Sequence, residues 1–254
     1  MLGVPGAEEG LGGSGFVGLP SGSGFEGVSL GPELAGVPSG PEDEGMPLGP
    51  DLAGAGDSGR GVPGFDEVQR RLAGFERRVV PVTDGLRRAA VTVCVLDGAG
   101  GLPYAVLIRR APRGRNAGQW ALPGGRVEDG EEPVRAGLRE LEEEVGVSGV
   151  RVAGVLDDFV TESGFVITPV VAFGGAQRPV PDPREVASVH LVALEAFLRP
   201  GVPRWRGGLL QMPLGPGIVI HAPTGAILWQ FAEVALRGRE LRVFDVEQPH
   251  WTRT

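Results

Sequence analysis

Three glutamates within five residues, Glu140, Glu143 and Glu144, are the side chains best suited to chemistry. At helical spacing i, i+3 and i+4 they share one helix face, where like charges repel by a few tenths of a kcal/mol per pair. They also lie toward the carboxyl end of the predicted helix, which the helix dipole disfavours for anions. A hard divalent cation such as Mg²⁺ or Mn²⁺ prefers carboxylate oxygens and would remove this conflict. A solvated acidic face is the alternative, and the cluster alone does not choose between them.

The helix that positions these carboxylates is predicted over Pro133–Val145. Proline is favourable in a first helical turn, and the following Gly146 is a favourable helix stop. Leu138, Leu141 and Val145 recur at i, i+3 and i+7 and form an apolar stripe beside the glutamates. The pattern therefore predicts a helix that buries one face and presents a neighbouring acidic face.

The segment around this helix resembles the Nudix signature, G-x5-E-x7-R-E-U-x-E-E-x-G-U, in which U is aliphatic. Every defined position is filled, by Gly125, Glu131, Arg139, Glu140, Leu141, Glu143, Glu144, Gly146 and Val147. Seven fixed residues give chance odds on the order of 10⁻⁹ per start position, so the motif is highly specific. The resemblance implies the Nudix fold, an α/β (α+β) domain whose mixed β-sheet is sandwiched between helices. It also implies an enzyme that hydrolyses a diphosphate linkage with the help of a divalent metal.

The resemblance assigns a role to each matching carboxylate. It implies that Glu140 and Glu144 are core ligands of Mg²⁺ or Mn²⁺ and that Glu143 is a further carboxylate of the metal site. The backbone carbonyl of Gly124 is expected to join them. Such an ion would neutralise the diphosphate and lower the pKa of the attacking water. Arg139 and Glu131 match a pair that orients the helix by a salt bridge and are expected to be structural support.

One more carboxylate is expected from a loop outside the signature. Glu185, just before a predicted strand, is the candidate, and Asp182 is the competitor. A cap of a helix or strand is the alternative role for either. The general base, which takes the proton from water, stays open among Glu185, Glu140 and Glu143.

The residues before the signature point toward the substrate. Arg109, Gly118 and Pro123–Gly125 match the segment that precedes the box in coenzyme A pyrophosphatases, and residues 156–169 and 221–228 also resemble those enzymes. Candidates to bind substrate phosphates are Arg109, Arg110, Arg113 and Arg115, with an ordinary solvated basic loop as the alternative. Trp120 is the candidate to stack on a base, with a packing role as the alternative. The predicted substrate is a small nucleoside-diphosphate-linked molecule, including coenzyme A or acyl-coenzyme A. ADP-ribose, a dinucleotide cofactor or a damaged nucleoside triphosphate remain alternatives, as does a non-catalytic nucleotide-sensing module.

The composition divides the chain into two parts. Residues 1–64 hold 20 of the 44 glycines, nine acidic residues and one basic residue, with no apolar periodicity. They are predicted to be a disordered acidic Gly/Pro-rich tail. Residues 65–254 are expected to form the Nudix domain, with a flanking N-terminal helix over Phe65–Val79 and a C-terminal helix over Thr224–Leu236. Strands are predicted at Ala89–Leu96, Tyr104–Ile108, Val150–Phe159, Phe165–Phe173 and Val186–Val192.

The remaining features exclude several classes of protein. Residues 65–254 hold 23 acidic and 23 basic residues, so no nucleic-acid binding is expected. No apolar run of membrane-spanning length and no secretory signal are visible, so no membrane partner and a cytoplasmic location are expected. A homodimer is left open. Cys94 stands alone, which excludes an intramolecular disulfide, and is expected to be buried. His190, His221 and His250 lack metal-ligand spacing and are expected to be structural.

Overall fold

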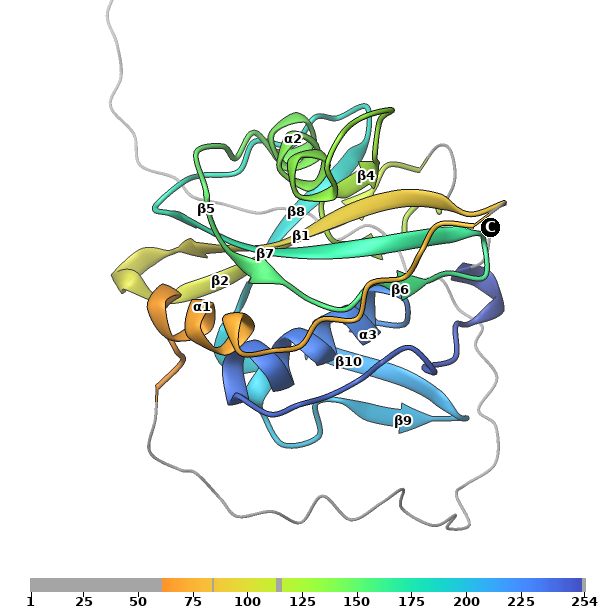
Figure 1. Cartoon of the computed structure of the whole chain (residues 1–254). Coiled ribbons are helices and arrows are strands. Elements are labelled where there is room, and N and C mark those ends of the chain that lie inside the picture. The colour runs from red at the N-terminus through yellow and green to blue at the C-terminus, as the bar shows by residue number, and fades with distance from the viewer. Residues whose placement is uncertain (1–60, 84, 113–115, 253–254) are drawn as a thin grey trace, which may run out of the picture. The chain divides into compact units, whose positions relative to one another are not determined.

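The computed structural model describes residues 61–252, with residue 84 and residues 113–115 left out. All of its helices and strands belong to one compact unit, Gly56–Thr254 (Figure 1). The expectation of a disordered tail over 1–64 therefore falls almost entirely outside the described residues. So does the expectation that Arg113 or Arg115 binds phosphate.

A mixed β-sheet forms the centre of this unit. Its strands follow the order β3 (Trp120–Ala121), β2 (Pro103–Arg110), β1 (Arg87–Asp97), β7 (Phe165–Gly175) and β5 (Arg151–Val155). Strands β1 and β7 run parallel, whereas β1 and β2, β2 and β3, and β5 and β7 are antiparallel. Three further strands join this sheet: β4 (Gly124–Arg126) pairs with β1, β6 (Phe159–Val160) with β7, and β8 (Val186–Ala193) with β2.

Strands β1 and β2 separate along their length, and this separation positions the acidic helix. They pair only from Val95 to Asp97 of β1. Nearer its N-terminal end β1 pairs with β4 instead, and toward its C-terminal end β2 pairs with β3. The chain crosses from β3 to β4 through Pro123, whose carbonyl accepts a hydrogen bond from the Thr92 amide at 2.8 Å. Gly124 and Gly125 are thereby placed opposite the middle of β1.

Helix α2 (Pro133–Val145) covers one face of the sheet, as the apolar stripe predicts. Leu141 and Val145 are fully buried there against Cys94 and Leu96 of β1 and Ile108 of β2. Burial of side chains of this size stabilises the fold by roughly 1.5–3 kcal/mol each. The Thr92 hydroxyl adds a hydrogen bond of 2.8 Å to the Gly137 carbonyl inside the helix.

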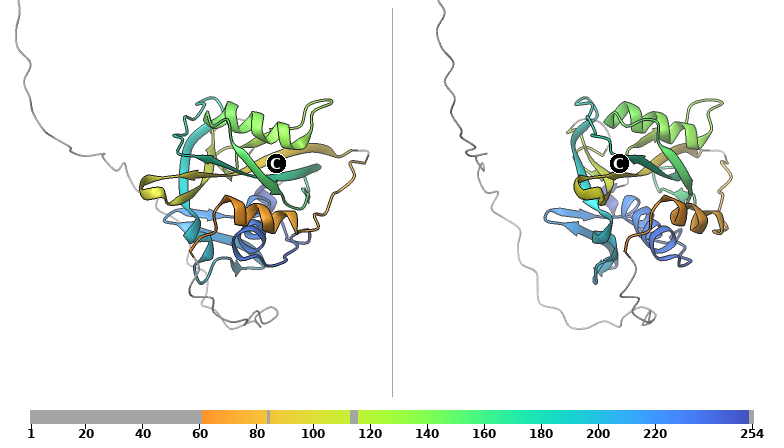
Figure 2. Two further views of the ribbon diagram at one scale, coloured as in Figure 1. Left: turned by 60° about the vertical axis from the view of Figure 1, so that its left-hand side comes forward. Right: turned by 90° about the vertical axis from the view of Figure 1, so that its left-hand side faces the viewer.

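The opposite face is covered by α1 (Phe65–Ala73), α3 (Thr224–Gln230) and its continuation as a π-helix, η3 (Phe231–Arg237). Figures 1 and 2 show these elements on the other side of the sheet from α2. Val93 and Val95 of β1 point into this larger core, whereas Cys94 and Leu96 face α2, which is the two-residue alternation of a strand. The expected sheet sandwiched between helices is therefore observed.

A second, three-stranded sheet was not expected from the sequence. It has the order β11 (Ile218–Ile220), β10 (Leu209–Gly215) and β9 (Arg204–Arg206), all antiparallel. Leu210, Met212 and Ile220 join the larger core. The 3₁₀ turns η1 (Ala99–Gly101), η2 (Leu194–Leu198) and η4 (His250–Thr252) complete the described elements.

Two predicted elements are shorter than expected. The helix predicted over Phe65–Val79 ends at Ala73, because the chain leaves the helix at Gly74. The strand predicted over Val150–Phe159 is interrupted at residues 156–158. Both interruptions have one cause: the buried carboxylates of Asp157 and Asp158 accept hydrogen bonds from the segment that follows α1.

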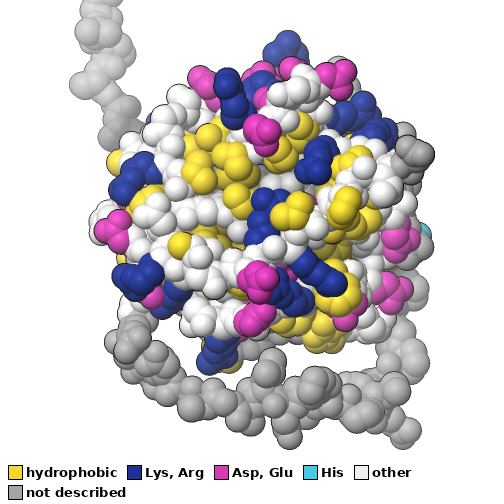
Figure 3. All heavy atoms as spheres, in the orientation of Figure 1, with side chains coloured by type: hydrophobic (Ala, Val, Ile, Leu, Met, Phe, Trp, Pro, Cys, Tyr) yellow, Lys and Arg dark blue, Asp and Glu magenta, His cyan; other side chains and the backbone are white. Residues whose placement is uncertain are grey.

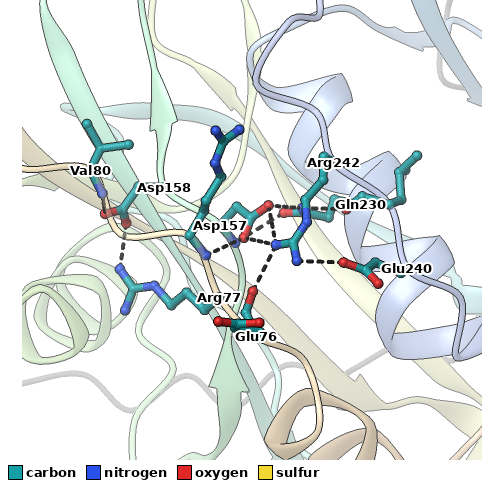
Figure 4. Close-up of polar contacts among 10 residues, drawn as sticks. Glu76, Arg77, Val80, Asp157, Asp158, Gln230, Glu240 and Arg242 are labelled. Atoms are coloured by element: carbon teal, nitrogen blue, oxygen red, sulfur yellow. Dashed lines mark hydrogen bonds and ion pairs between the residues drawn. The ribbon is translucent and has the colours of Figure 1, made fainter.

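Figure 4 shows this polar network. Asp157 accepts hydrogen bonds from the Arg78 amide at 2.7 Å, the Arg242 guanidinium at 2.8 Å and the Gln230 side chain at 2.8 Å. Asp158 accepts from Arg77 at 2.6 Å and from the Val80 amide at 2.9 Å. A buried carboxylate is tolerated when it is paired and hydrogen-bonded in this way. The network therefore joins the segment after α1 to the C-terminal segment.

The surface carries charges of both signs. On the face in Figure 3, arginines and carboxylates are interspersed around patches of hydrophobic side chains. Within residues 61–252, gaps excepted, no helix is long and apolar enough to span a membrane.

Candidate functional site

Glu144 is the most buried acidic side chain of α2, with a relative exposure of 1%. One of its oxygens accepts a hydrogen bond from the Gly124 amide at 2.9 Å, and the other, Oε1, has no hydrogen-bond partner. Burial, more than any other cause, raises the pKa of Glu144 to about 7. A buried carboxylate oxygen without a partner is costly in a folded protein, and it indicates a missing ligand.

Two glycines of β4 bring the backbone against these carboxylates. A Cβ atom on Gly125 would lie 2.3 Å from Glu140 Oε1, and a Cβ atom on Gly124 would lie 2.3 Å from the Ala90 carbonyl oxygen. Gly124 also has a φ of +156°. The backbone of β1 leaves room for glycine alone at position 124, whereas a side chain at position 125 would displace the Glu140 carboxylate. The two glycines thus allow β4 to lie close to β1 and α2.

Arg139 lies at the centre of the acidic face. Its guanidinium contacts Glu131 at 3.1 Å, as the resemblance implies, and also Glu140 at 3.0 Å and Glu143 at 2.9 Å. The contacts with Glu140 and Glu143 were not expected, and they relieve part of the like-charge repulsion predicted along the helix. Glu140 is half-buried, and burial is the largest cause that raises its pKa. Glu143 is largely exposed, with 58% of its side chain accessible.

The two candidate carboxylates outside the helix, Asp182 and Glu185, differ in their charged neighbours. Asp182 is bound by the Arg184 guanidinium at 2.6 Å, which lowers its pKa. Glu185 instead raises the pKa of both Glu140 and Glu144 through its charge, so it lies near both. Backbone hydrogen bonds hold this loop against the end of α2, because the Asp182 amide donates to the Glu144 carbonyl at 2.9 Å. The structure thus brings Glu185, and not the side chain of Asp182, to the acidic face.

A cavity of about 300 Å³ opens beside the two glycines. Its lining comes from β1, β2, β4, the β6–β7 turn and the C-terminal segment: Ala89, Val91, Arg110, Asn116, Gly124, Gly125, Arg126, Thr161, Ser163, Phe165, Ile167, Pro223 and Thr252. Arg110 favours the charged form of Glu144, which places this cation near the carboxylates. Arg126 lies 5.8 Å from the centre of the Phe165 ring. The cavity therefore combines two cations, three hydroxyls and glycine backbone.

Arg109 and Trp120, both expected to bind substrate, lie apart from this cavity. Arg109 donates to the Gly118 carbonyl at 3.0 Å, and its guanidinium lies 5.6 Å from the centre of the Trp120 ring. Trp120 packs edge-on against His190, with 4.6 Å between ring centres, and lines a second cavity of about 150 Å³. It is the next residue of β2, Arg110, that faces the larger cavity.

Comparison with known proteins identifies the family. A family model described as NUDIX domain matches residues 86–212, half of the chain, and this range contains the whole signature and the acidic face. The chain belongs to the Nudix family. The uncharacterized Nudix hydrolase NudL of Citrobacter koseri is 37% identical over 142 residues, which cover 54% of this chain and 73% of that protein.

Other Nudix relatives match a smaller share of their own length. Nudix hydrolase 22, chloroplastic, of Arabidopsis thaliana is 32% identical over 155 residues, which cover 53% of this chain and 51% of that protein. This chain thus spans about half the length of that relative. A solved Nudix hydrolase from M. Smegmatis, RenU, is 25% identical with a TM-score of 0.42, and the match covers 63% of this chain and 92% of that one.

Nudix hydrolases generally need divalent metal ions, and the donor set fits one. Glu144 offers a buried unpartnered oxygen, and Glu140 and Glu185 raise its pKa, as carboxylates do when they share a site without a cation. Oxygen donors of this kind suit Mg²⁺ or Mn²⁺. Within the described part of the chain, however, no three Asp, Glu, His or Cys side chains converge closely enough to hold an ion as they stand. Because Arg139 binds Glu140, that carboxylate must turn to join Glu144.

Several lining residues were not singled out from the sequence. Arg126 lies inside the Nudix signature at an undefined position, and Thr161, Ser163 and Phe165 come from a distant hairpin. The only available signal was that residues 156–169 and 221–228 resemble coenzyme A pyrophosphatases. The structure places Thr161, Phe165 and Pro223 from these two segments in one cavity.

Proposed function

We propose that this protein hydrolyses a diphosphate linkage in a nucleoside-diphosphate-linked substrate and depends on a divalent metal ion. The observation that carries the proposal is the buried Glu144 carboxylate. It has one oxygen without a hydrogen-bond partner, and its other oxygen is bound by Gly124, which lines the larger cavity. A carboxylate with no function would be stabilised by an ion-pair partner or by solvent. Among the described residues Glu144 makes no ion pair within 4.0 Å and is closed to solvent, so its anionic form has the Gly124 amide and the more distant charge of Arg110.

The ligands of the proposed metal are Glu144, Glu140 and the Gly124 carbonyl, with Glu143 as a further carboxylate. When bound, such an ion neutralises diphosphate charge and lowers the pKa of water. Glu144 is held by the Gly124 amide, and the absence of a side chain at Gly125 leaves room for the Glu140 carboxylate. Both glycines belong to β4, so the strand and the helix together orient the ligands.

The cations of the larger cavity would bind the substrate. Arg110 and Arg126 offer guanidinium groups, which suit phosphate oxygens because they donate two parallel hydrogen bonds. We assign the general base to Glu185. Its carboxylate has no ion pair within 4.0 Å among the described residues, whereas Arg139 binds both Glu140 and Glu143. A carboxylate without such a partner is the better proton acceptor.

The two segments that resemble coenzyme A pyrophosphatases support coenzyme A or an acyl-coenzyme A as the first substrate to examine. Their residues Thr161, Ser163, Phe165 and Pro223 line the same cavity as Arg126. Other nucleotides with a diphosphate linkage fit the same chemistry, so they belong in the same experiment.

The test is a substrate panel followed by ³¹P NMR. The full chain is incubated with Mg²⁺ or Mn²⁺ and coenzyme A, ADP-ribose, a dinucleotide cofactor or a nucleoside triphosphate. We expect two phosphorylated products from at least one of them, and no products in excess EDTA. Hydrolysis that persists in EDTA would contradict the metal dependence. Absence of turnover with the whole panel, together with tight nucleotide binding, would favour a nucleotide-sensing module instead.

A further inference from the structure

The smaller cavity, of about 150 Å³, is built largely by residues outside the matched Nudix range of 86–212. Gln119 and Trp120 form one side. Residues 219–224 and the C-terminal Trp251 and Thr252 form the rest. Pro223 and Thr252 also line the larger cavity, so the two cavities are direct neighbours. One elongated molecule could therefore occupy both.

Three aromatic rings line the smaller cavity, those of Trp120, His221 and Trp251. The His221 and Trp251 rings pack edge to face, with 5.5 Å between their centres, and Trp251 makes the same contact with His250 at 5.0 Å. Trp120 contributes a third ring to the lining. Nearly half of the Trp251 surface, 45%, is left accessible although the ring is large and apolar. Such rings bind flat heteroaromatic groups through stacking.

A chain of hydrogen bonds fixes the proton on His221. The Arg204 Nε donates to Gln211 Oε1 at 3.0 Å, which sets the orientation of the Gln211 amide. Its Nε2 then lies 3.2 Å from His221 Nε2 and must donate, so His221 Nε2 is the acceptor. Burial lowers the pKa of His221, which keeps the ring neutral. The remaining proton is therefore on Nδ1, where it is available as a donor.

Gln119 supplies a hydrogen-bond acceptor that complements the His221 donor. Its Nε2 donates to the Trp251 carbonyl at 2.8 Å, and this contact leaves Oε1 as an acceptor. Two residues of the cavity lining, His221 and Gln119, thus carry one ring N–H donor and one amide acceptor. Adenine carries the matching edge, a ring-nitrogen acceptor beside an amino donor.

We propose that the smaller cavity is the base-binding subsite, that it takes an adenine-type base, and that His221, Gln119 and Trp251 determine this preference. The inference rests on the proposed function, because the base would be tethered to the diphosphate in the neighbouring cavity. It assigns part of substrate selection to two residues beyond the Nudix match, His221 and Trp251. Gln211 is a positioning residue that acts through the His221 tautomer.

The test uses binding without metal, so it is independent of turnover. The full chain in EDTA is titrated with AMP and, separately, with ribose 5-phosphate, and tryptophan fluorescence is recorded. We expect AMP to quench the fluorescence and to bind at least tenfold more tightly than ribose 5-phosphate. Trp251→Ala and His221→Asn should each weaken AMP binding at least tenfold. Trp205→Phe is the matched control, since Trp205 is 51% exposed, lines neither cavity and should leave the AMP affinity unchanged.

The Gln211→Leu variant distinguishes a positioning role of Gln211 from a purely structural one. It removes the group that sets the His221 tautomer, so AMP should bind several-fold more weakly while the thermal midpoint confirms folding. For the substrate found above, KM should rise and kcat should stay nearly constant. Equal affinities for AMP and ribose 5-phosphate, or unchanged AMP binding in Trp251→Ala, would overturn the inference even if hydrolysis is observed. AMP binding as described without hydrolysis would overturn the proposed function and leave the subsite standing.

Discussion

Glu144 is a carboxylate in surroundings that suit a neutral group. Its single hydrogen bond comes from the Gly124 amide, and its other oxygen is buried without a partner. Selection for stability alone would favour glutamine at this position. Glutamine keeps a hydrogen-bond acceptor for the Gly124 amide and a similar helix propensity, but carries no charge. We therefore interpret the negative charge of Glu144 as a functional requirement. Its replacement by glutamine should lower activity but raise stability.

For activity, Glu144→Gln should lower kcat by several orders of magnitude at saturating Mg²⁺, because the proposed metal loses its buried ligand. Glu142→Gln is the matched control on the same helix. Glu142 is exposed and occupies an undefined position of the signature, so its substitution should be nearly silent. Initial rates of product release for the two variants decide the matter. Equal activities would show that the acidic face is only solvated surface.

For stability, the effect of Glu144→Gln should depend on pH in the metal-free protein. The pKa of Glu144 is raised from 4.5 to about 7, so folding favours the protonated form. Its stabilising contribution is present below pH 4.5 and is lost as the pH rises to about 7. At pH 8 the variant should be more stable than wild type by about 3 kcal/mol, and at pH 4.5 by far less. Urea unfolding in EDTA at both pH values measures this, and a pH-independent difference would contradict it.

Glu185 should behave as a general base rather than as a structural residue. Glu185→Gln should lower kcat by roughly 10²–10⁴ and remove the acidic limb of the pH–rate profile, with little change in the thermal midpoint. Asp182→Asn is the control from the same loop. Asp182 is held by Arg184 and should affect the midpoint more than the rate profile. A retained acidic limb in Glu185→Gln would transfer the role to Glu140 or Glu143.

At the scale of elements, α2 could be predicted from sequence to its observed bounds, Pro133–Val145. Local signals sufficed there, namely a first-turn proline, a glycine stop and an apolar stripe. The strand predicted over Val150–Phe159 failed because its break depends on Asp157, whose partners include Arg242, 85 residues away. Likewise β9 and β11 contain three residues each, too few for a periodic pattern to be recognised.

The candidate site also has features that could be predicted from the local sequence and features that could not. The spacing of Glu140, Glu143 and Glu144 on one helix face is a local property, and it is read directly from the sequence. The burial of Glu144, the contacts of Arg139 with Glu140 and Glu143, and the convergence of Phe165 and Pro223 on one cavity are properties of the tertiary structure. No local sequence pattern indicates which loops come together in the folded protein.

Cys94 offers a reporter for the packing of α2 against the sheet. The thiol is fully buried between β1 and α2, and burial raises its pKa to about 12. A thiol reagent reacts with the thiolate, so labelling of the native protein should be negligible and should follow unfolding in denaturant. Leu141→Ala, which removes the fully buried neighbour, should destabilise the fold by about 2–5 kcal/mol and speed up labelling. Fast labelling of the native wild-type protein would contradict this packing.

At the scale of the whole molecule, the folded unit is larger than the matched Nudix range. Helix α1 precedes residue 86, and α3 and η3 follow residue 212, yet all three contribute to the larger core. A fragment limited to residues 86–212 should therefore aggregate or unfold. A fragment of residues 61–254 should melt cooperatively and keep the kcat of the full chain, because the composition of residues 1–60 cannot support a core. Calorimetry and the hydrolysis assay compare the fragments, and a folded 86–212 fragment would contradict the shared core.

The contacts between the two flanks also set the order in which the protein can fold during synthesis. Arg71 of α1 donates to the Ala235 carbonyl, 164 residues later, and Arg242 donates to the Glu76 carbonyl, 166 residues earlier. The layer between α2 and the sheet needs only residues up to β8, so it can assemble on the ribosome. Helix α1, although made early, cannot complete these contacts until η3 and Arg242 have left the exit tunnel. During that interval its apolar side remains available to chaperones.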